Sequence, residues 1–279
     1  MDTIRRPSSM PLNKGKPLDQ LQSSPRTKRW LHEFIAQTPE LRSTLHRAPD
    51  GIHFKLAGLS DSDAEKILEE RNRRLLPEPQ VAWIRNGSQR QLIWAQLELE
   101  REIRGFHPFS TVPSEERSDA LLLMLDIWPE SLTTKKDLIF QIKESWANHR
   151  LKDKQLSWFD PKNQKQLAWA MDYLKQHRMA LPGSVPEPAT PKEEYDYVVA
   201  ALDKTTLLHP SDHKLFLAAI RKAWSQYKYR HSGKAKKPLY LFIEEEAKEK
   251  LDQIAERQKR SRHDIVEDWI LQAFEKGDF

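Results

Sequence analysis

The chain has 279 residues, a formal net charge of +5 and a sequence pI near 9.2. It contains no cysteine, which excludes disulfide bonds and thiolate metal sites. No run of about 18 apolar residues occurs and the first residues lack the apolar core of a signal peptide, so we expect a cytoplasmic protein with no membrane partner. Eight glycines and 31% charged residues favour a mainly α-helical chain.

The first segment of the chain is rich in proline, serine, lysine and arginine. This composition predicts that residues 1–25 form a disordered basic tail. Apolar residues then recur at helical spacing, which predicts a helix that starts near Lys28 and buries Trp30, Leu31, Phe34 and Ile35.

Clusters of proline divide the next two hundred residues. They lie at residues 77–79, 108–113 and 181–191, where proline interrupts helices and favours extended linkers. We therefore expect three helical units, which span residues 26–110, 111–185 and 186–233.

The middle of the chain contains an internal repeat. Residues 81–100 align without gaps with residues 156–175, at an offset of 75 positions. The identical pairs are Trp83/Trp158, Gln89/Gln164, Gln91/Gln166, Leu92/Leu167, Trp94/Trp169, Ala95/Ala170 and Leu99/Leu174. Residues 119–126 and 142–148 similarly match residues 196–203 and 220–226. The pattern predicts tandem helical repeat units with a period of about 75 residues.

The repeated tryptophans have two interpretations. Aromatic residues at helical spacing usually pack in a core, which is the interpretation we favour for Trp83, Trp94, Trp158 and Trp169. The alternative is an exposed surface that stacks bases or anchors a protein partner. The matched Gln-x-Gln pairs are expected on exposed helix positions or in bonds that close turns.

Several helix starts can be predicted from capping residues. Thr134 with Asp137 is a capping-box pattern, and Asp160-Pro161 is a second start signal. Thr190, Pro191 and Glu193 form a third.

We find no convincing catalytic constellation in the sequence, and we predict a protein that is not an enzyme and needs no cofactor. His209 and His213 have the i, i+4 spacing of a metal-binding pair but lack a third strong ligand nearby. His209-Pro210 is more typical of a helix start, so no metal site is predicted.

The last forty residues carry the most informative pattern. Leu239, Leu241 and Ile243 alternate along a short strand. Apolar stripes then predict two amphipathic helices, formed by Ala247, Leu251, Ile254 and Ala255 and by Ile265, Val266, Trp269, Ile270 and Ala273. A basic turn at residues 257–260 and a capping pattern of Ser261 with Asp264 separate the helices.

This order of elements in residues 236–274 resembles the ribbon-helix-helix (CopG/MetJ/Arc-like) family of DNA-binding dimers. The resemblance assigns residues 236–279 to a C-terminal ribbon-helix-helix and implies a homodimer through residues 238–274. It also implies double-stranded DNA as a partner. One strand and two helices make a small core, so pairing of two copies is a physical expectation as well.

The resemblance also implies the DNA-binding residues. Outward strand positions would read bases and the start of the second helix would hold phosphate. The residues implied, with the basic residues that lead into the strand, are Lys234, Lys236, Lys237, Tyr240, Phe242, Arg260, Ser261, Arg262 and His263. Phe242 departs from the family pattern, because base-reading positions are usually polar or basic.

The function implied is sequence-specific binding of double-stranded DNA by a dimer. Such proteins act as regulators, partition factors or DNA-transfer accessory factors of bacteria and mobile elements, and would be associated with the nucleoid. The alternative is an adaptor that dimerises through the same unit and holds an enzyme or a toxin on the tryptophan-containing repeats, as in a defence or conjugation complex.

Overall fold

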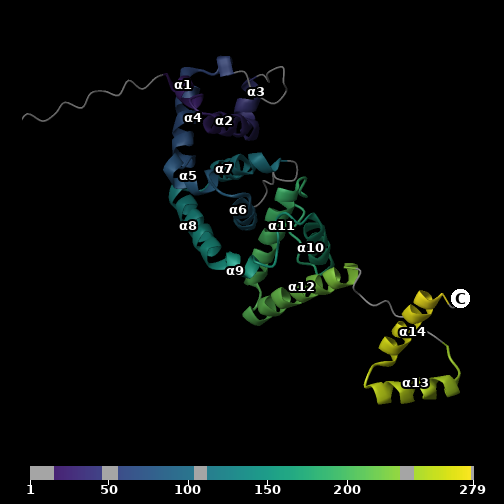
Figure 1. Ribbon diagram of the computed structural model, residues 1–279. Coiled ribbons are helices and arrows are strands. Elements are labelled where there is room, and N and C mark those ends of the chain that lie inside the picture. The colour runs from purple at the N-terminus through teal and green to yellow at the C-terminus, as the bar shows by residue number, and fades with distance from the viewer. Residues whose placement is uncertain (1–15, 46–55, 104–111, 233–241, 278–279) are drawn as a thin grey trace, which may run out of the picture. The chain divides into compact units, whose positions relative to one another are not determined.

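A computed structural model of the chain describes residues 16–45, 56–103, 112–232 and 242–277. Figure 1 shows the helices along the chain. The prediction of a mainly α-helical protein is confirmed, and the described residues contain no strand. None of the helices in the described ranges combines the length and apolar character needed to cross a bilayer.

The first seven α-helices are α1 (Pro17–Leu21), α2 (Pro25–Gln37), α3 (Pro39–Thr44), α4 (Asp61–Arg74), α5 (Glu78–Arg85), α6 (Gln89–Glu102) and α7 (Arg117–Ile127). The next five are α8 (Leu132–His149), α9 (Asp153–Leu156), α10 (Gln164–Gln176), α11 (Pro191–Lys204) and α12 (Pro210–His231). The last two are α13 (Glu245–Gln258) and α14 (Arg262–Lys276). Short 3-10 turns are η1 (Leu56–Gly58), η3 (Ser114–Glu116) and η4 (Thr205–Leu207).

The chain divides into two compact units. Unit 1 runs from Met1 to Ser225, and unit 2 runs from Gln226 to Phe279. Unit 1 therefore covers most of the stretch predicted to form three helical units, and the boundaries predicted within it stay predictions.

Three apolar clusters form the core of unit 1. The first joins α1, α2 and α4 around Leu21, Trp30 and Leu31, with Ile127 of α7. The second joins α5 to α8, and the third joins α10, α11 and α12 with Ile93 of α6. Neighbouring clusters are linked by pairs of helices, since α2 packs on α7 and α6 packs on α11 (Figure 1).

Ordered structure begins earlier than the predicted tail of residues 1–25 allows. Helix α1 lies inside that range, and its Leu21 is completely buried beside Trp30. The polar composition of the tail hid this contact, because a single leucine contributes little to an average over 25 residues. Residues 1–15 lie outside the described ranges.

The two aligned segments contain the same hydrogen bond. Nε2 of Gln91 donates to the backbone carbonyl of Trp83 at 2.8 Å, and Nε2 of Gln166 donates to that of Trp158 at 2.9 Å. Both bonds close the turn that precedes a helix. The prediction that the repeated glutamines make turn bonds is thus confirmed for these two residues.

The same segments bring tryptophans together in the same way. Trp94 of α6 contacts Trp146 of α8, with ring centroids 6.0 Å apart. Trp169 of α10 contacts Trp224 of α12 at 5.1 Å. Trp94, Trp146 and Trp224 are buried, and Trp169 is half-buried against the third cluster. Trp83 and Trp158 also pack against the apolar clusters, so the core interpretation of the repeated tryptophans is confirmed.

Two buried ion pairs join the packed helix pairs. Arg26 of α2 donates two hydrogen bonds, of 2.7 and 2.6 Å, to Asp126 of α7. Arg90 of α6 likewise donates two bonds of 2.6 Å to Asp203 of α11. Both carboxylates are almost inaccessible to solvent, with exposed fractions of 1% and 0%. Such two-pronged pairs fix how one helix lies against the next.

The predicted helix starts have mixed outcomes. Thr190 and Glu193 form the predicted capping box at α11, and α12 starts at Pro210 as predicted. Ser131 caps α8, where Thr134 was predicted, because its Oγ accepts the Thr134 N–H.

Asn163 caps α10, so the prediction of a helix start at Asp160-Pro161 is wrong. The Asp160 carboxylate instead accepts the Lys162 N–H and forms a turn. Serine and asparagine are strong caps, and they displaced the predicted residues because they lie next to the first buried turn.

Candidate nucleic-acid interface

Unit 2 contains the two C-terminal helices that the sequence predicts. Helix α13 ends at Lys259, which adopts the left-handed conformation with φ of 50° and so reverses the chain. Helix α14 follows at once, capped by Ser261, whose Oγ accepts the Asp264 N–H at 3.2 Å. The predicted helices and the predicted cap are therefore confirmed.

The strand half of the predicted ribbon-helix-helix is not seen. Four of its implied DNA-binding residues, Lys234, Lys236, Lys237 and Tyr240, lie outside the described residues. Phe242 is described, and it is fully exposed and belongs to no strand. A β-ladder needs a second strand, and the resemblance supplies that strand from another copy of the chain. The ribbon therefore stays a prediction.

The phosphate-binding residues implied by the resemblance lie together around the start of α14. Ser261 is the N-cap, and Arg262 and His263 are the first two residues of the helix. Arg260 comes immediately before the cap. Backbone N–H groups at the start of a helix are free to bind anions, so this grouping suits a phosphate.

Both arginines of this group already have acidic partners. Nη2 of Arg260 lies 2.6 Å from a carboxylate oxygen of Asp268, one helical turn beyond the cap. Nη2 of Arg262 donates to Asp252 of α13 at 2.7 Å. Sequence reasoning missed these pairs, because Asp252 approaches Arg262 only when the two helices fold against each other. All four side chains are between one third and about one half exposed, so the pairs are weak.

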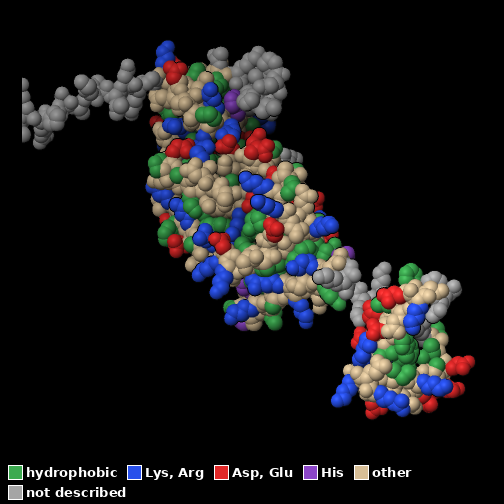
Figure 2. Space-filling model, in the orientation of Figure 1, with side chains coloured by type: hydrophobic (Ala, Val, Ile, Leu, Met, Phe, Trp, Pro, Cys, Tyr) green, Lys and Arg blue, Asp and Glu red, His purple; other side chains and the backbone are tan. Residues whose placement is uncertain are grey.

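The apolar faces of α13 and α14 are largely uncovered. Among the described residues of unit 2, only Ile265 is buried. Trp269, Ile270 and Phe274 of α14 have exposed fractions of 47%, 53% and 73%. Figure 2 shows apolar side chains of this unit flanked by charged ones on the face in view. The helical stripe that the sequence predicts to be buried thus has no cover within one copy.

Charge is unevenly distributed along unit 2. Residues 226–241 contain five lysines and arginines and no acidic residue. Residues 242–277 contain ten aspartates and glutamates against seven lysines and arginines. The positive potential that would attract DNA therefore comes from the segment before α13, and the two helices themselves carry a small excess of negative charge.

The histidines of the His209 and His213 pair bind neighbouring hydroxyl groups. Nδ1 of His209 lies 2.7 Å from Oγ of Ser211, and Nδ1 of His213 lies 2.9 Å from Oγ1 of Thr205. Within the described ranges, no cluster of three or more histidine, aspartate or glutamate side chains is arranged to hold a metal ion. The pair therefore serves the start of α12 and the turn before it.

No protein-family model, curated protein or solved structure matches this chain. The ribbon-helix-helix resemblance consequently rests on the residue pattern of 236–274. The functional argument below uses that pattern together with the exposed apolar face and the charges of unit 2.

Proposed function

We propose that this chain is a double-stranded DNA-binding protein that acts as a dimer through unit 2. The observation that carries the proposal is the uncovered apolar face of α13 and α14, which directly follows a strongly basic segment. In bacteria or mobile elements, such a dimer would serve as a regulator, a partition factor or a DNA-transfer accessory factor.

The dimer is supported by what unit 2 leaves exposed. Phe242, Trp269, Ile270 and Phe274 are large apolar residues with half or more of their surface accessible, Trp269 falling just short of half. Soluble proteins rarely leave such residues together without a partner. A second copy would present the same face and cover both, as closed two-fold symmetry requires.

DNA binding is supported by the basic segment and by the start of α14. Residues 228–237 supply five positive charges without an acidic neighbour in sequence. At the start of α14, Arg260 and Arg262 hold exposed carboxylates, and such pairs contribute about 1 kcal/mol or less. A DNA phosphate at this helix end can therefore replace Asp268 and Asp252 at little cost.

Unit 1 supports the proposal as a platform built from related helices. A cap, a cation two residues later and a tryptophan four residues after that recur at three helix starts. These triplets are Ser24–Arg26–Trp30, Ser88–Arg90–Trp94 and Asn163–Lys165–Trp169. We infer that unit 1 is a tandem array, with Lys165 at its solvent-exposed end.

The test is fluorescence-anisotropy binding of the full-length protein to a pool of native duplexes at two salt concentrations. We expect selective binding that weakens steeply with salt, because neutralised phosphates release counterions. Arg262→Ala should weaken binding to every duplex several-fold. Arg73→Ala is the matched control, since Arg73 is also an exposed arginine that pairs with a carboxylate on a helix.

Dimerisation is tested separately by the mass of the protein in solution. Ile270→Asp places a charge on the uncovered face of α14 and should convert a dimer to a monomer without loss of helix content. Glu267→Lys changes the charge of an exposed residue on the same helix and serves as the control. A monomeric wild type, or an unchanged dimer in Ile270→Asp, would remove the central support of the proposal.

A second candidate function is an adaptor that dimerises through unit 2 and holds a protein partner. The acidic excess of residues 242–277 favours this candidate, because like charge repels DNA. The tryptophans predicted to hold the partner are in cores, so a partner would have to use other surfaces of unit 1. Dimerisation without salt-sensitive DNA binding would favour the adaptor.

A further inference from the structure

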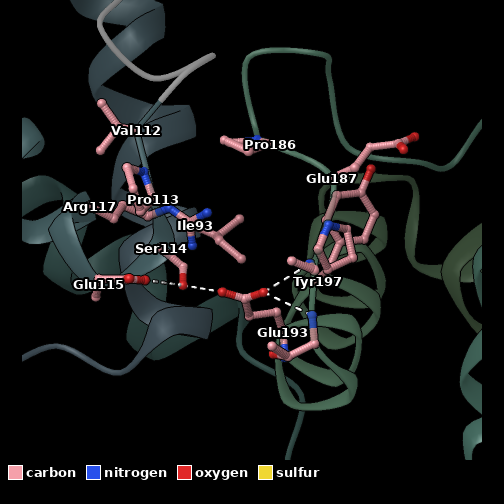
Figure 3. Close-up of a pocket in the computed structure, with 13 residues that line it drawn as sticks. Ile93, Val112, Pro113, Ser114, Glu115, Arg117, Pro186, Glu187, Glu193 and Tyr197 are labelled. Atoms are coloured by element: carbon pink, nitrogen blue, oxygen red, sulfur yellow. Dashed lines mark hydrogen bonds between the residues drawn. The ribbon is translucent and has the colours of Figure 1, made fainter.

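A pocket lies where the N-terminal ends of α7 and α11 approach each other (Figure 3). Its volume is about 320 Å³, which is at the lower end of the range for sites that bind small molecules. Ile93, Pro186 and Tyr197 supply apolar walls. Arg117 lies on one side of the pocket in Figure 3, and Glu193 lies on the other.

Arg117 is a buried cation with few partners. Its exposed fraction is 6%, and burial lowers the pKa of its guanidinium. Among the described residues, it makes one hydrogen bond, from Nη1 to Oε1 of Gln89 at 2.7 Å, and no ion pair within 4 Å. A guanidinium has five N–H groups, so most of its donors are not used by the protein.

Glu193, in contrast, has both oxygens occupied. Its Oε1 accepts a hydrogen bond from the Ser114 hydroxyl, and its Oε2 accepts from the N–H groups of Ala189 and Thr190 at 2.9 and 3.1 Å. The Ser114 hydroxyl and these N–H groups lower the pKa of the Glu193 carboxyl. The charge of Glu193 offsets that of Arg117 only at a distance, and this carboxylate is committed to capping α11.

The position of Arg117 opposes the helix dipole. It is the first residue of α7, an 11-residue helix whose N-terminal end carries partial positive charge. A cation there is unfavourable, whereas an anion would be attracted by both the helix end and the guanidinium. The buried, sparsely bonded Arg117 and the dipole of α7 therefore point to the same kind of ligand.

We propose that this pocket binds a small organic monocarboxylate, with its carboxylate on Arg117 and its apolar body against Ile93 and Tyr197. Two N–H groups of an arginine match the two oxygens of a carboxylate. A doubly charged phosphate ester is less suitable, because Glu115, Glu187 and Glu193 also line the pocket. This binding site is independent of the DNA-binding proposal for unit 2.

The test uses four probes of similar shape with the full-length protein: benzoate, benzyl alcohol, benzylamine and phenyl phosphate. Binding is followed at neutral pH and constant ionic strength by titration calorimetry and by NMR of the arginine side-chain N–H groups. We expect benzoate to bind most tightly and to shift the signals of one buried arginine. Equal affinity for benzyl alcohol would show an apolar cavity only, and preference for benzylamine or phenyl phosphate would overturn the proposal.

Variants then assign the site to Arg117. Arg117→Met should weaken benzoate binding by at least about tenfold and leave benzyl alcohol binding unchanged, since a charged hydrogen-bonded pair is lost. Arg117→Lys keeps the charge and should retain part of the affinity. Arg101→Met, an exposed arginine on α6, is the control.

The outcome remains decisive if Arg117→Met does not fold. In that case, Arg117→Lys and the NMR signals of the wild type carry the test, because the lysine variant removes the two-pronged geometry alone. Unchanged benzoate affinity in every folded variant of Arg117 would overturn the assignment, as would the absence of any benzoate-dependent shift in an arginine signal.

Discussion

Unit 1 and unit 2 use the same kind of helix but bury it differently. Unit 1 covers its apolar faces internally and joins helices by buried ion pairs such as Arg90–Asp203. Unit 2 leaves most of its apolar stripe exposed and keeps its ion pairs at the surface. The difference indicates that unit 1 is complete as a single copy, whereas unit 2 is half of an interface.

The largest effect that would sharpen this comparison is expected in unit 1. Arg90→Met leaves Asp203 buried with only the Leu151 N–H as a printed partner, and should lower the free energy of unfolding by about 3–5 kcal/mol. Chemical denaturation measures the loss. The double variant Arg90→Met/Asp203→Leu should recover most of it, because an apolar pair replaces the isolated charge. A loss under 1 kcal/mol would contradict the view that this pair holds α6 to α11.

A smaller effect is expected from the buried Lys135 of unit 1. Burial lowers the pKa of its ammonium group to about 8 from the ordinary 10.5, and its Nζ donates to the carbonyl of Arg74 at 2.9 Å. The folded-state pKa is thus below the unfolded one, so the unfolded chain binds more protons above pH 8. Stability should therefore rise with pH through this window.

The rise attributable to Lys135 should be about 2 kcal/mol between pH 8 and about pH 9.5, below the ordinary range of tyrosine ionisation. Denaturation at a series of pH values measures it for the wild type and for Lys135→Met, which should lose the slope. Lys136→Met changes the exposed neighbour and should keep the slope. Identical pH profiles for the wild type and Lys135→Met would refute the assignment.

The smallest effect is expected in unit 2. Asp252→Asn removes the partner of Arg262 at the surface and should change the free energy of unfolding by less than about 1 kcal/mol. The same variant should strengthen DNA binding if phosphate replaces Asp252, and anisotropy measures that gain. Weaker DNA binding by Asp252→Asn would mean that the carboxylate positions Arg262 and does not compete with phosphate.

The sequence by itself determined much of the local structure. The helices of unit 2, the Ser261 cap, the capping box of Thr190 and Glu193, and the burial of the repeated tryptophans follow from spacings of a few residues. These features depend on the 3.6-residue period and on orphan N–H groups at helix starts, which are properties of short segments. The buried Leu21 was missed, because tail composition outweighed one apolar residue.

Only the tertiary structure decided which distant residues meet. Asp126 is 100 residues from Arg26, and Asp203 is 113 residues from Arg90, so no local pattern assigns these partners. The pocket around Arg117 likewise exists because two loops, far apart in the chain, end against the same helices. Helix formation is governed by neighbours in sequence, whereas the partner of a buried charge is set by how the helices pack.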